Sequence, residues 1–453
     1  MLGNSGVGFG TLNLTSKRTS EYPSSYPIIT FHLFDIRHIM TDMEPRNKPR
    51  NMAISEGLWR NISSMEPLLP DGQENILAEL TTEITFQSGC LSGSRIPQKT
   101  REGIEKVVQQ MNSYYSNLIE GHKTSPLEVE KALKKNFDKD PKKKALQQLG
   151  VAHIETEEII KKRLKDESMV SLWSSDFLKM IHREFYSPLS PEQRIITSSG
   201  GKEYPLIPGE FRTYNVDVAR HVPPDYSCLE KFIARFEEFY GWNNITPTRR
   251  LIAIAASHHR LLWIHPFGDG NGRVARLFSH AALIQNGVDG YGLWTLARGL
   301  ARKRDDYYSY LARADSIRLN DNDGRGNLSA KYLAEFCEFF LTTILDQITF
   351  MSSVLEYVGL KHRIENYVYR NNIFGKHNDQ GRYLLLEALH EGEYPRGDAP
   401  RLTGYGETNA RNLLQIALNQ GLLTSDGPRS PVRLGFPSEV LEDYFPKLFM
   451  PSD

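Results

Sequence analysis

Cysteine is scarce in this chain of 453 residues. Its three cysteines, Cys90, Cys228 and Cys337, are odd in number, lie far apart and form no CxxC pair. The pattern offers neither a disulfide framework nor a zinc site. Such cysteine usage is typical of a reducing compartment, and we predict a cytoplasmic location.

The chain also lacks a net charge and a long uninterrupted apolar run. The first absence argues against a general affinity for polyanions, and the second argues against a membrane protein. The 55 basic and 55 acidic residues leave no net charge to attract nucleic acid or anionic lipid. The most apolar stretch, LIAIAASHHRLLWI at 251–264, is interrupted by two histidines and an arginine, and the chain does not open with the pattern of a signal peptide. A soluble intracellular protein with no membrane partner is therefore expected.

Helical periodicity dominates from residue 101 onward, whereas residues 1–100 are predicted to be partly irregular. Within residues 1–55 the glycine-rich VGFGTLN lacks the GxGxxG spacing of a phosphate loop. The lysine run KKNFDKDPKKK is interleaved with aspartates, which is typical of a solvated face. Extended segments are expected around SGGKEYPL and GEFRTYNVDVARHVPP, with a hairpin near 206–218. Helices are predicted at 101–118, 127–148, 154–186, 228–241, 246–264, 274–287, 301–317 and 328–357.

The last block, residues 362–453, reads as helix, helix and then a glycine- and proline-containing hairpin. This order predicts a winged-helix-like domain with a recognition-type helix at 406–419. Such domains bind DNA or proteins, and homodimer formation is a further alternative. Six basic and six acidic residues between 380 and 437 leave the choice open, because DNA binding needs several phosphate contacts.

The richest chemistry lies in HPFGDGNGRVAR, residues 265–276. Gly268, Gly270 and Gly272 allow a turn whose amides face one point, and a helix begins directly after it. Arg273 and Arg276 are three residues apart, so both guanidinium groups can lie on one side of the first turn. Amides and paired cations at a helix start suit a chain of phosphates.

Three other side chains complete this set. Asp269 supplies the hard oxygen that Mg²⁺ prefers when phosphates provide the remaining ligands. Asn271 can donate to a phosphate oxygen without adding charge. His265 precedes a proline at the end of a helix and can take a proton from a hydroxyl near neutral pH. Together they predict phosphoryl or nucleotidyl transfer. His258, His259 and His280 lack partners at ligand spacing and are predicted to be core or surface residues.

The stretch 265–276 resembles the signature of the Fic family, HxFx(D/E)GNGRxxR, at every defined position. The resemblance extends over about residues 101–345, and FRTYNVDVARHVPP is similar to the segment that precedes the signature. It implies a mainly α fold, a helical core with a small β-hairpin flap. It also implies an enzyme that transfers AMP from ATP, with Mg²⁺, to a Ser, Thr or Tyr hydroxyl of a protein, itself included.

By that resemblance His265 is the general base, Asp269 holds the metal, and Asn271 with the amides of Gly270 and Gly272 cradles the phosphates. Arg273 and Arg276 clamp them, the second at the γ-phosphate. Phe267 packs under the loop, the hairpin near 206–218 pins an extended target segment, and Tyr307 and Tyr308 line the adenine pocket or are core aromatics.

An inhibitory pattern of the same family, (S/T)xxxE(G/N), fits SNLIEG with Ser116, Glu120 and Gly121. The resemblance implies an inhibitory helix near 103–120. At its end Glu120 could form a bidentate pair with Arg276 and so occupy the fork meant for the γ-phosphate.

Three alternatives to AMP transfer remain at this point. The chain could be a transcription regulator in which the nucleotide site only senses its ligand. It could be a Fic enzyme that moves another phosphate-containing group, or one that removes AMP. The presence of both His265 and Asp269 favours an enzyme, because sensing needs neither a base nor a catalytic metal.

Overall fold

The computed structural model describes residues 58–70, 74–166, 171–197, 201, 203–216, 218, 221–241 and 244–449, which belong to one compact unit. The predictions made for residues 1–55, including VGFGTLN, lie outside this part of the chain. The described residues are mainly helical, which confirms the predicted fold class, and their strands are short.

The part of the chain before the C-terminal block is built mainly from helices. They are α1 (Glu74–Ser92), α2 (Gln98–Ile119), α3 (Pro126–Leu133), α4 (Pro141–Asp166), α5 (Ser175–Tyr186), α6 (Leu229–Tyr240), α7 (Arg250–Ile264), α8 (Asn271–Gln285), α9 (Leu296–Arg302), α10 (Arg304–Ala314) and α11 (Ala330–Val354).

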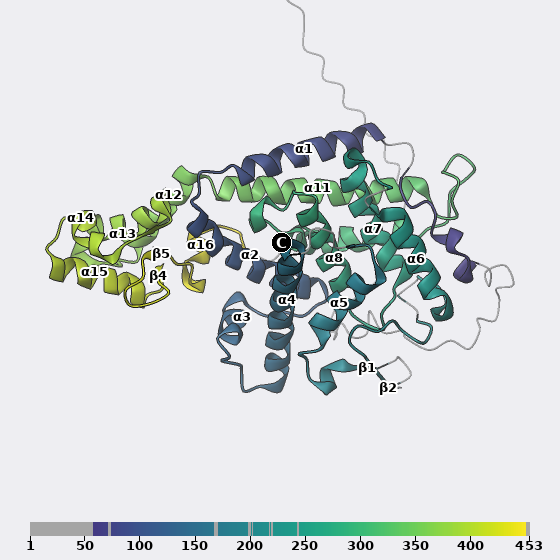
Figure 1. Cartoon of the computed structure of the whole chain (residues 1–453), viewed down its shortest axis with the longest axis horizontal. Coiled ribbons are helices and arrows are strands. Elements are labelled where there is room, and N and C mark those ends of the chain that lie inside the picture. Colours follow the sequence, from purple (N-terminus) through teal and green to yellow (C-terminus); the bar gives the residue numbers. More distant parts are fainter. Residues whose placement is uncertain are drawn as a thin grey trace, which may run out of the picture. The chain divides into compact units, whose positions relative to one another are not determined.

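Helix α7 forms the centre of the core, because residues on all its sides are buried. A helix that is apolar all round has to be enclosed by other elements, and α7 contacts α6, α8 and α11. Figure 1 shows α1 running side by side with α11, a long amphipathic helix. Helix α1 was not predicted, since the region before residue 100 was expected to be partly irregular.

Three predicted helices are each divided in two. The stretch 127–148 breaks at Lys135, whose φ of 61° lies in the left-handed region, and α4 restarts at Pro141. The stretch 154–186 is interrupted before α5, whose first turn is capped by Ser174 through its bond from the Phe177 amide, 3.2 Å. The stretch 301–317 breaks at Lys303, between α9 and α10.

The hairpin predicted near 206–218 is wrong in position. The antiparallel pair consists of β1 (Ile195–Thr197) and β2 (Glu203–Pro205), with Ile196 opposite Tyr204. Pro205 and Pro208 have no amide hydrogen for a ladder, and Gly209 has a φ of 83°. Residues 206–216 therefore run as a loop beside the hairpin.

The C-terminal block contains α12 (Tyr357–Arg370), α13 (Asn378–Glu391), α14 (Ala399–Thr403), α15 (Glu407–Asn419) and α16 (Leu441–Tyr444). A three-stranded antiparallel sheet has the order β3 (Glu393–Tyr394), β5 (Val432–Leu434), β4 (Leu423–Thr424). The predicted helix at 406–419 and the following hairpin are confirmed as elements. Their assignment to a winged helix, DNA contact and homodimer formation stay predictions.

The end of this block returns to α2. The hydroxyl of Tyr115 donates to the carbonyl of Leu448, 3.1 Å away, and Arg298 donates to the carbonyls of Lys447 and Leu448. Among the helices that the structure describes, none combines the length and the apolar character needed to cross a membrane.

Candidate active site

The site begins where α7 ends, at His265. This residue adopts a left-handed conformation, φ 49° and ψ 60°, and its amide donates to the carbonyl of Leu261, 3.1 Å away. Left-handed backbone costs a non-glycine residue about 1–3 kcal/mol, so the surrounding contacts must hold it there. The following Pro266 prevents the helix from continuing.

Arg212 supplies those contacts. Its side chain donates to the carbonyl oxygens of His265 (2.9 Å), Tyr214 (2.9 Å) and Pro224 (2.6 Å), and its amide donates to the carbonyl of Pro266, 2.9 Å away. Only 4% of Arg212 is exposed. A planar guanidinium group can serve several acceptors in fixed directions, so this arginine joins the loop at 206–216 to the backbone of the motif.

The imidazole of His265 is neutral at physiological pH. Burial lowers its pKa to about 3, and the charge of Arg212 lowers it further, whereas the charge of Glu120 opposes the shift. A neutral imidazole has a free lone pair and can accept a proton from a hydroxyl group. Part of the residue nevertheless remains exposed and can be reached by a substrate.

The glycine-rich loop is fastened from within. Asn271 accepts from the amide of Phe267 at 3.0 Å and donates to its carbonyl at 2.9 Å. The ring of Phe267 is fully buried and stacks on His182 with centroids 4.1 Å apart. In the described structure Asn271 thus braces the loop, and its predicted contact with a phosphate stays a prediction.

Helix α8 starts directly after this loop. Its N-cap is Gly270, whose φ of 82° favours glycine, and its first backbone bond runs from Val274 to Gly270, 2.9 Å. The amides of residues 271–273 consequently precede the hydrogen-bonded ladder of the helix and can face an anion. The sequence prediction of a helix start at this loop is confirmed.

The β1–β2 hairpin lies against the same loop. A Cβ atom placed on Gly268 would come within 2.5 Å of the Tyr214 hydroxyl and 2.8 Å of Ile196 Cδ1. Glycine is therefore required by close packing at this position. Tyr214 also stacks on Tyr204 with centroids 4.7 Å apart. Strand β1 and the loop at 206–216 thus both lie next to the motif.

Arg276 is held by the end of α2. Its Nε donates to the hydroxyl of Ser116 at 2.9 Å, and its Nη2 donates to the Ser116 carbonyl at 3.0 Å and to Oε1 of Glu120 at 2.6 Å. Arg276 and Glu120 expose 4% and 12% of their side chains. Gly121, with φ 80°, ends the helix directly after Glu120.

The carboxylate of Glu120 lies over the first turn of α8. A Cβ on Gly272 would collide with its Oε1. Burial alone would raise the pKa of Glu120, but the charges of Arg276 and Arg273 outweigh burial and keep it below the usual value. An ionised carboxylate therefore occupies the place where the motif offers amides and guanidinium groups to an anion.

Arg273 also contacts the inhibitory segment. It donates to Nδ1 of His122 at 3.0 Å and, at 3.5 Å, to Oδ1 of Asn117, and its third donor contact is the hydroxyl of Tyr186, 3.1 Å away. Tyr186 in turn donates to Oδ2 of Asp269 at 2.9 Å. Sequence reasoning missed Asn117, which stands at a variable position of SNLIEG, and it missed His122 and Tyr186, which belong to no motif.

Tyr307 and Tyr308 lie beside this cluster. The hydroxyl of Tyr307 is 2.7 Å from Nε2 of His258, and its ring is buried. Tyr308 donates to the carbonyl of Ile119, the last residue of α2, at 3.3 Å. Both therefore have core contacts, and their place in an adenine pocket stays a prediction.

The remaining histidines of the motif region are structural. His258, His259 and His280 are buried, which agrees with the first of the two predicted alternatives, core or surface. Within the described ranges no group of three or more His, Cys, Asp or Glu side chains could hold a metal ion. The single carboxylate of Asp269, which is exposed, fits Mg²⁺ bound jointly with phosphates, because Mg²⁺ commonly takes one or two protein carboxylates.

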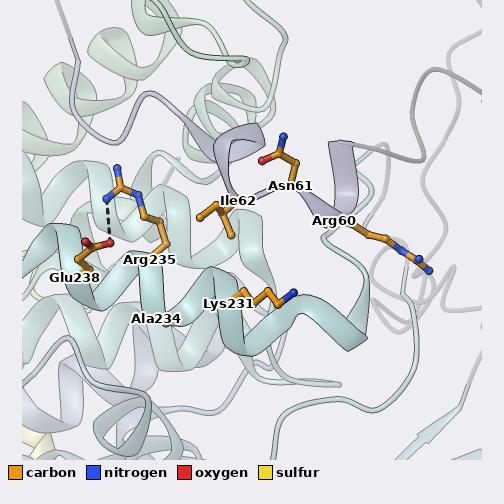
Figure 2. A pocket seen from close by; sticks show the side chains of 7 residues that line it. All are labelled: Arg60, Asn61, Ile62, Lys231, Ala234, Arg235 and Glu238. Atoms are coloured by element: carbon orange, nitrogen blue, oxygen red, sulfur yellow. Dashed lines mark hydrogen bonds and ion pairs between the residues drawn. The ribbon is translucent and has the colours of Figure 1, made fainter.

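A separate pocket of about 720 Å³ lies between α6 and the turn at residues 60–62 (Figure 2). No residue of 265–276 lines it. Its arginines are paired with carboxylates: Arg60 with Asp225, and Arg235 with Glu66 and Glu238. The pocket therefore does not contribute to the site described above.

Comparison with known proteins places the motif in a family. Residues 172–283 match the Fic/DOC family. Proteins named protein adenylyltransferase Fic are 36% identical over 115 residues (Nematostella vectensis) and 33% over 111 residues (Drosophila erecta). The matches cover 25% and 24% of this chain, and 26% and 21% of those relatives. This chain therefore spans about a quarter of the length of the curated relatives it matches.

Solved structures to which the chain is similar include a Fic family protein from Desulfovibrio desulfuricans and residues 134–508 of Fic-1 from C. elegans. The first has a TM-score of 0.45 and 18% identity and covers 81% of this chain and 98% of that one. The second has a TM-score of 0.45 and 17% identity and covers 63% and 73%.

Proposed function

We propose that this chain, whose residues 172–283 are a Fic/DOC domain, is a protein adenylyltransferase that is autoinhibited by Glu120. The proposal covers transfer of AMP from ATP to a Ser, Thr or Tyr hydroxyl of a protein. The observation that carries it is the joint position of His265, the start of α8 and Arg276. Relatives named protein adenylyltransferase support the choice of reaction.

The chemistry follows from the groups present. The neutral imidazole of His265 takes the proton of the target hydroxyl, whose oxygen attacks the α-phosphorus of ATP. A new P–O bond to the protein forms, the bond to the β-phosphate breaks, and pyrophosphate leaves with its electron pair. The amides at the start of α8 and the guanidinium groups of Arg273 and Arg276 offset the negative charge of the phosphates.

Asp269 would hold Mg²⁺ together with the phosphates of ATP. A metal held there would neutralise part of the negative charge of the phosphates. The β1–β2 hairpin beside Gly268 would pair with an extended segment of the target, since an edge strand can accept another strand.

Glu120 inhibits the enzyme by competition for Arg276. One oxygen of its carboxylate accepts from Nη2, a single contact in place of the predicted bidentate pair, and Ser116 accepts from Nε and from Nη2. A γ-phosphate cannot use donors that are already engaged by an ionised carboxylate. Release of the end of α2 would free the fork and the amides together.

The first experiment tests the reaction. Wild type, Glu120→Gly and Glu120→Gly/His265→Ala are incubated with ATP labelled at the α-phosphate and a cell lysate. The proposal expects labelled protein bands with Glu120→Gly and their loss in the double variant. Label that persists without His265, or transfer from UTP or CTP but not ATP, would contradict it.

The second experiment tests inhibition by Glu120 with a matched control. Glu391 also precedes a glycine at the end of a helix, Gly392 with φ 86°, and its side chain is 57% exposed. Glu120→Gly should raise incorporation by about 10-fold or more, because a charge-assisted pair is worth about 1.5–3 kcal/mol. Glu391→Gly should leave the wild-type rate unchanged. Equal rates in the wild type and both variants would show that Glu120 does not inhibit the enzyme.

A further inference from the structure

Tyr186, the last residue of α5, connects two groups of the motif. Its hydroxyl donates to Oδ2 of Asp269 at 2.9 Å and accepts from Nη1 of Arg273 at 3.1 Å. The residue is 2% exposed. Its ring lies under the turn, because a Cβ on Gly270 would come within 2.6 Å of the Tyr186 ring and hydroxyl.

The direction of these bonds is fixed by charge. A guanidinium group can only donate, so the contact with Arg273 uses a lone pair of the Tyr186 hydroxyl. The single proton of that hydroxyl is then directed to Oδ2 of Asp269. One hydroxyl therefore orients an anion and a cation at the same time.

We propose that Tyr186 is a positioning residue that orients the Asp269 carboxylate for the metal ion of the nucleotide complex. This inference rests on the proposed function. A carboxylate has two oxygens, and the Tyr186 bond fixes Oδ2 while Oδ1 of the exposed side chain remains for a cation. Hydrogen bonds of this kind orient metal-binding carboxylates, and their loss weakens metal binding by about 10- to 100-fold.

A role in packing alone would have different consequences. The ring of Tyr186 contacts Phe185 and His182, with centroids 5.1 and 4.6 Å away, and these contacts survive replacement by phenylalanine. Only the hydroxyl bonds to Asp269 and Arg273 are lost. A change in metal dependence therefore separates positioning from packing.

The test compares Tyr186→Phe with Tyr240→Phe, each in the Glu120→Gly background. Tyr240 is a suitable control because it is also fully buried and its hydroxyl bonds to the carbonyl of Leu68, away from the motif. The affinity for α,β-methylene-ATP, which cannot transfer AMP, is measured by calorimetry in EDTA and with saturating Mg²⁺. The ratio of the two affinities gives the contribution of the metal.

Tyr186→Phe is expected to lower this ratio by about 10-fold, and Tyr240→Phe to leave it at the parent value. An unchanged ratio in Tyr186→Phe would overturn the inference. Binding does not depend on turnover: if the parent transfers no AMP but Tyr186→Phe still lowers the ratio, the proposed reaction fails and the positioning role stands. If the ratio is unchanged while the parent transfers AMP, the positioning role fails and the proposed reaction stands.

Discussion

At the scale of single residues, buried arginines set the geometry of the site. Arg212 binds the backbone carbonyls of His265 and Pro266, whereas Arg273 and Arg276 are turned toward the end of α2. The left-handed conformation of His265 makes its position depend on those contacts. We therefore expect the reaction to be sensitive to the shape of the Arg212 side chain as well as to its charge.

Arg212→Lys tests this expectation in the Glu120→Gly background. Lysine keeps the charge but cannot reach three carbonyl oxygens in fixed directions. The maximal rate of AMP incorporation should fall by about 10- to 100-fold, because small displacements of a reacting group are costly. Arg60→Lys, at an exposed ion pair with Asp225, is the control and should be neutral. A rate equal to that of the parent would show that Arg212 does not position His265.

The motif residues could be predicted from sequence because their chemistry is local. Glycines, a helix start and arginines three residues apart lie within 12 positions. Tyr186 and Arg212 could not be found in this way. Their functions depend on partners 83 and 53 residues away, Asp269 and His265, and on no recognisable spacing.

At the scale of secondary-structure elements, α2 is held against α4 by buried polar contacts. Asn112 donates to Oε2 of Glu157 at 2.6 Å and accepts from the hydroxyl of Thr295 at 2.5 Å. Lys161 joins Glu157 and Glu105 at 3.0 and 3.1 Å. Burial would raise the pKa of Glu157, but the charges of Lys161 and His280 outweigh it and hold this pKa far below its usual value. These contacts keep the end of α2 beside α8.

Asn112→Ala should loosen this attachment. It leaves Glu157 and Thr295 each without one buried partner, which costs about 1–3 kcal/mol. We expect a lower melting temperature and a several-fold higher basal rate of AMP incorporation. In the Glu120→Gly background the same substitution should not raise the rate, because the inhibitory carboxylate is already absent. An equal gain in both backgrounds would mean that α2 does not act through Glu120.

Element boundaries were predicted less well than element types. The periodic patterns of α2, α6, α8, α11 and α15 gave the correct helices. The flap was misplaced, because GEFRTYNVDVARHVPP was expected to be extended and part of a hairpin, whereas Arg212 and Tyr214 of this segment reach the motif from a loop. Tertiary contacts of Arg212 and Tyr214 decided that conformation, and they are invisible in a local pattern.

At the scale of the whole molecule, buried histidines make stability depend on pH. Burial lowers the pKa of His153 and of His258 to about 3, and that of His182 to about 4. In the unfolded chain these groups titrate near 6.5. Between those values the unfolded state binds more protons, so the stability present above about pH 6.5 is lost as the pH falls.

The melting temperature is therefore expected to decline from pH 7 to pH 5, a range above the titration of ordinary carboxylates. Each buried histidine contributes at most about 1.4 kcal/mol per pH unit. His153→Gln should make the decline shallower, and His362→Gln, at a side chain 67% exposed, should not. A melting temperature that stays constant or rises on acidification would contradict this prediction.

The central claim is that Glu120 occupies the guanidinium fork that a γ-phosphate would use. It is tested most directly by the affinities for ATP and ADP, measured by calorimetry with Mg²⁺ in His265→Ala and in Glu120→Gly/His265→Ala, which removes the base and hence turnover. We predict that ATP and ADP bind alike while Glu120 is present, and that its removal makes ATP bind about 10-fold tighter than ADP, as one charge-assisted contact would. The same ATP-to-ADP ratio in both proteins would contradict the account.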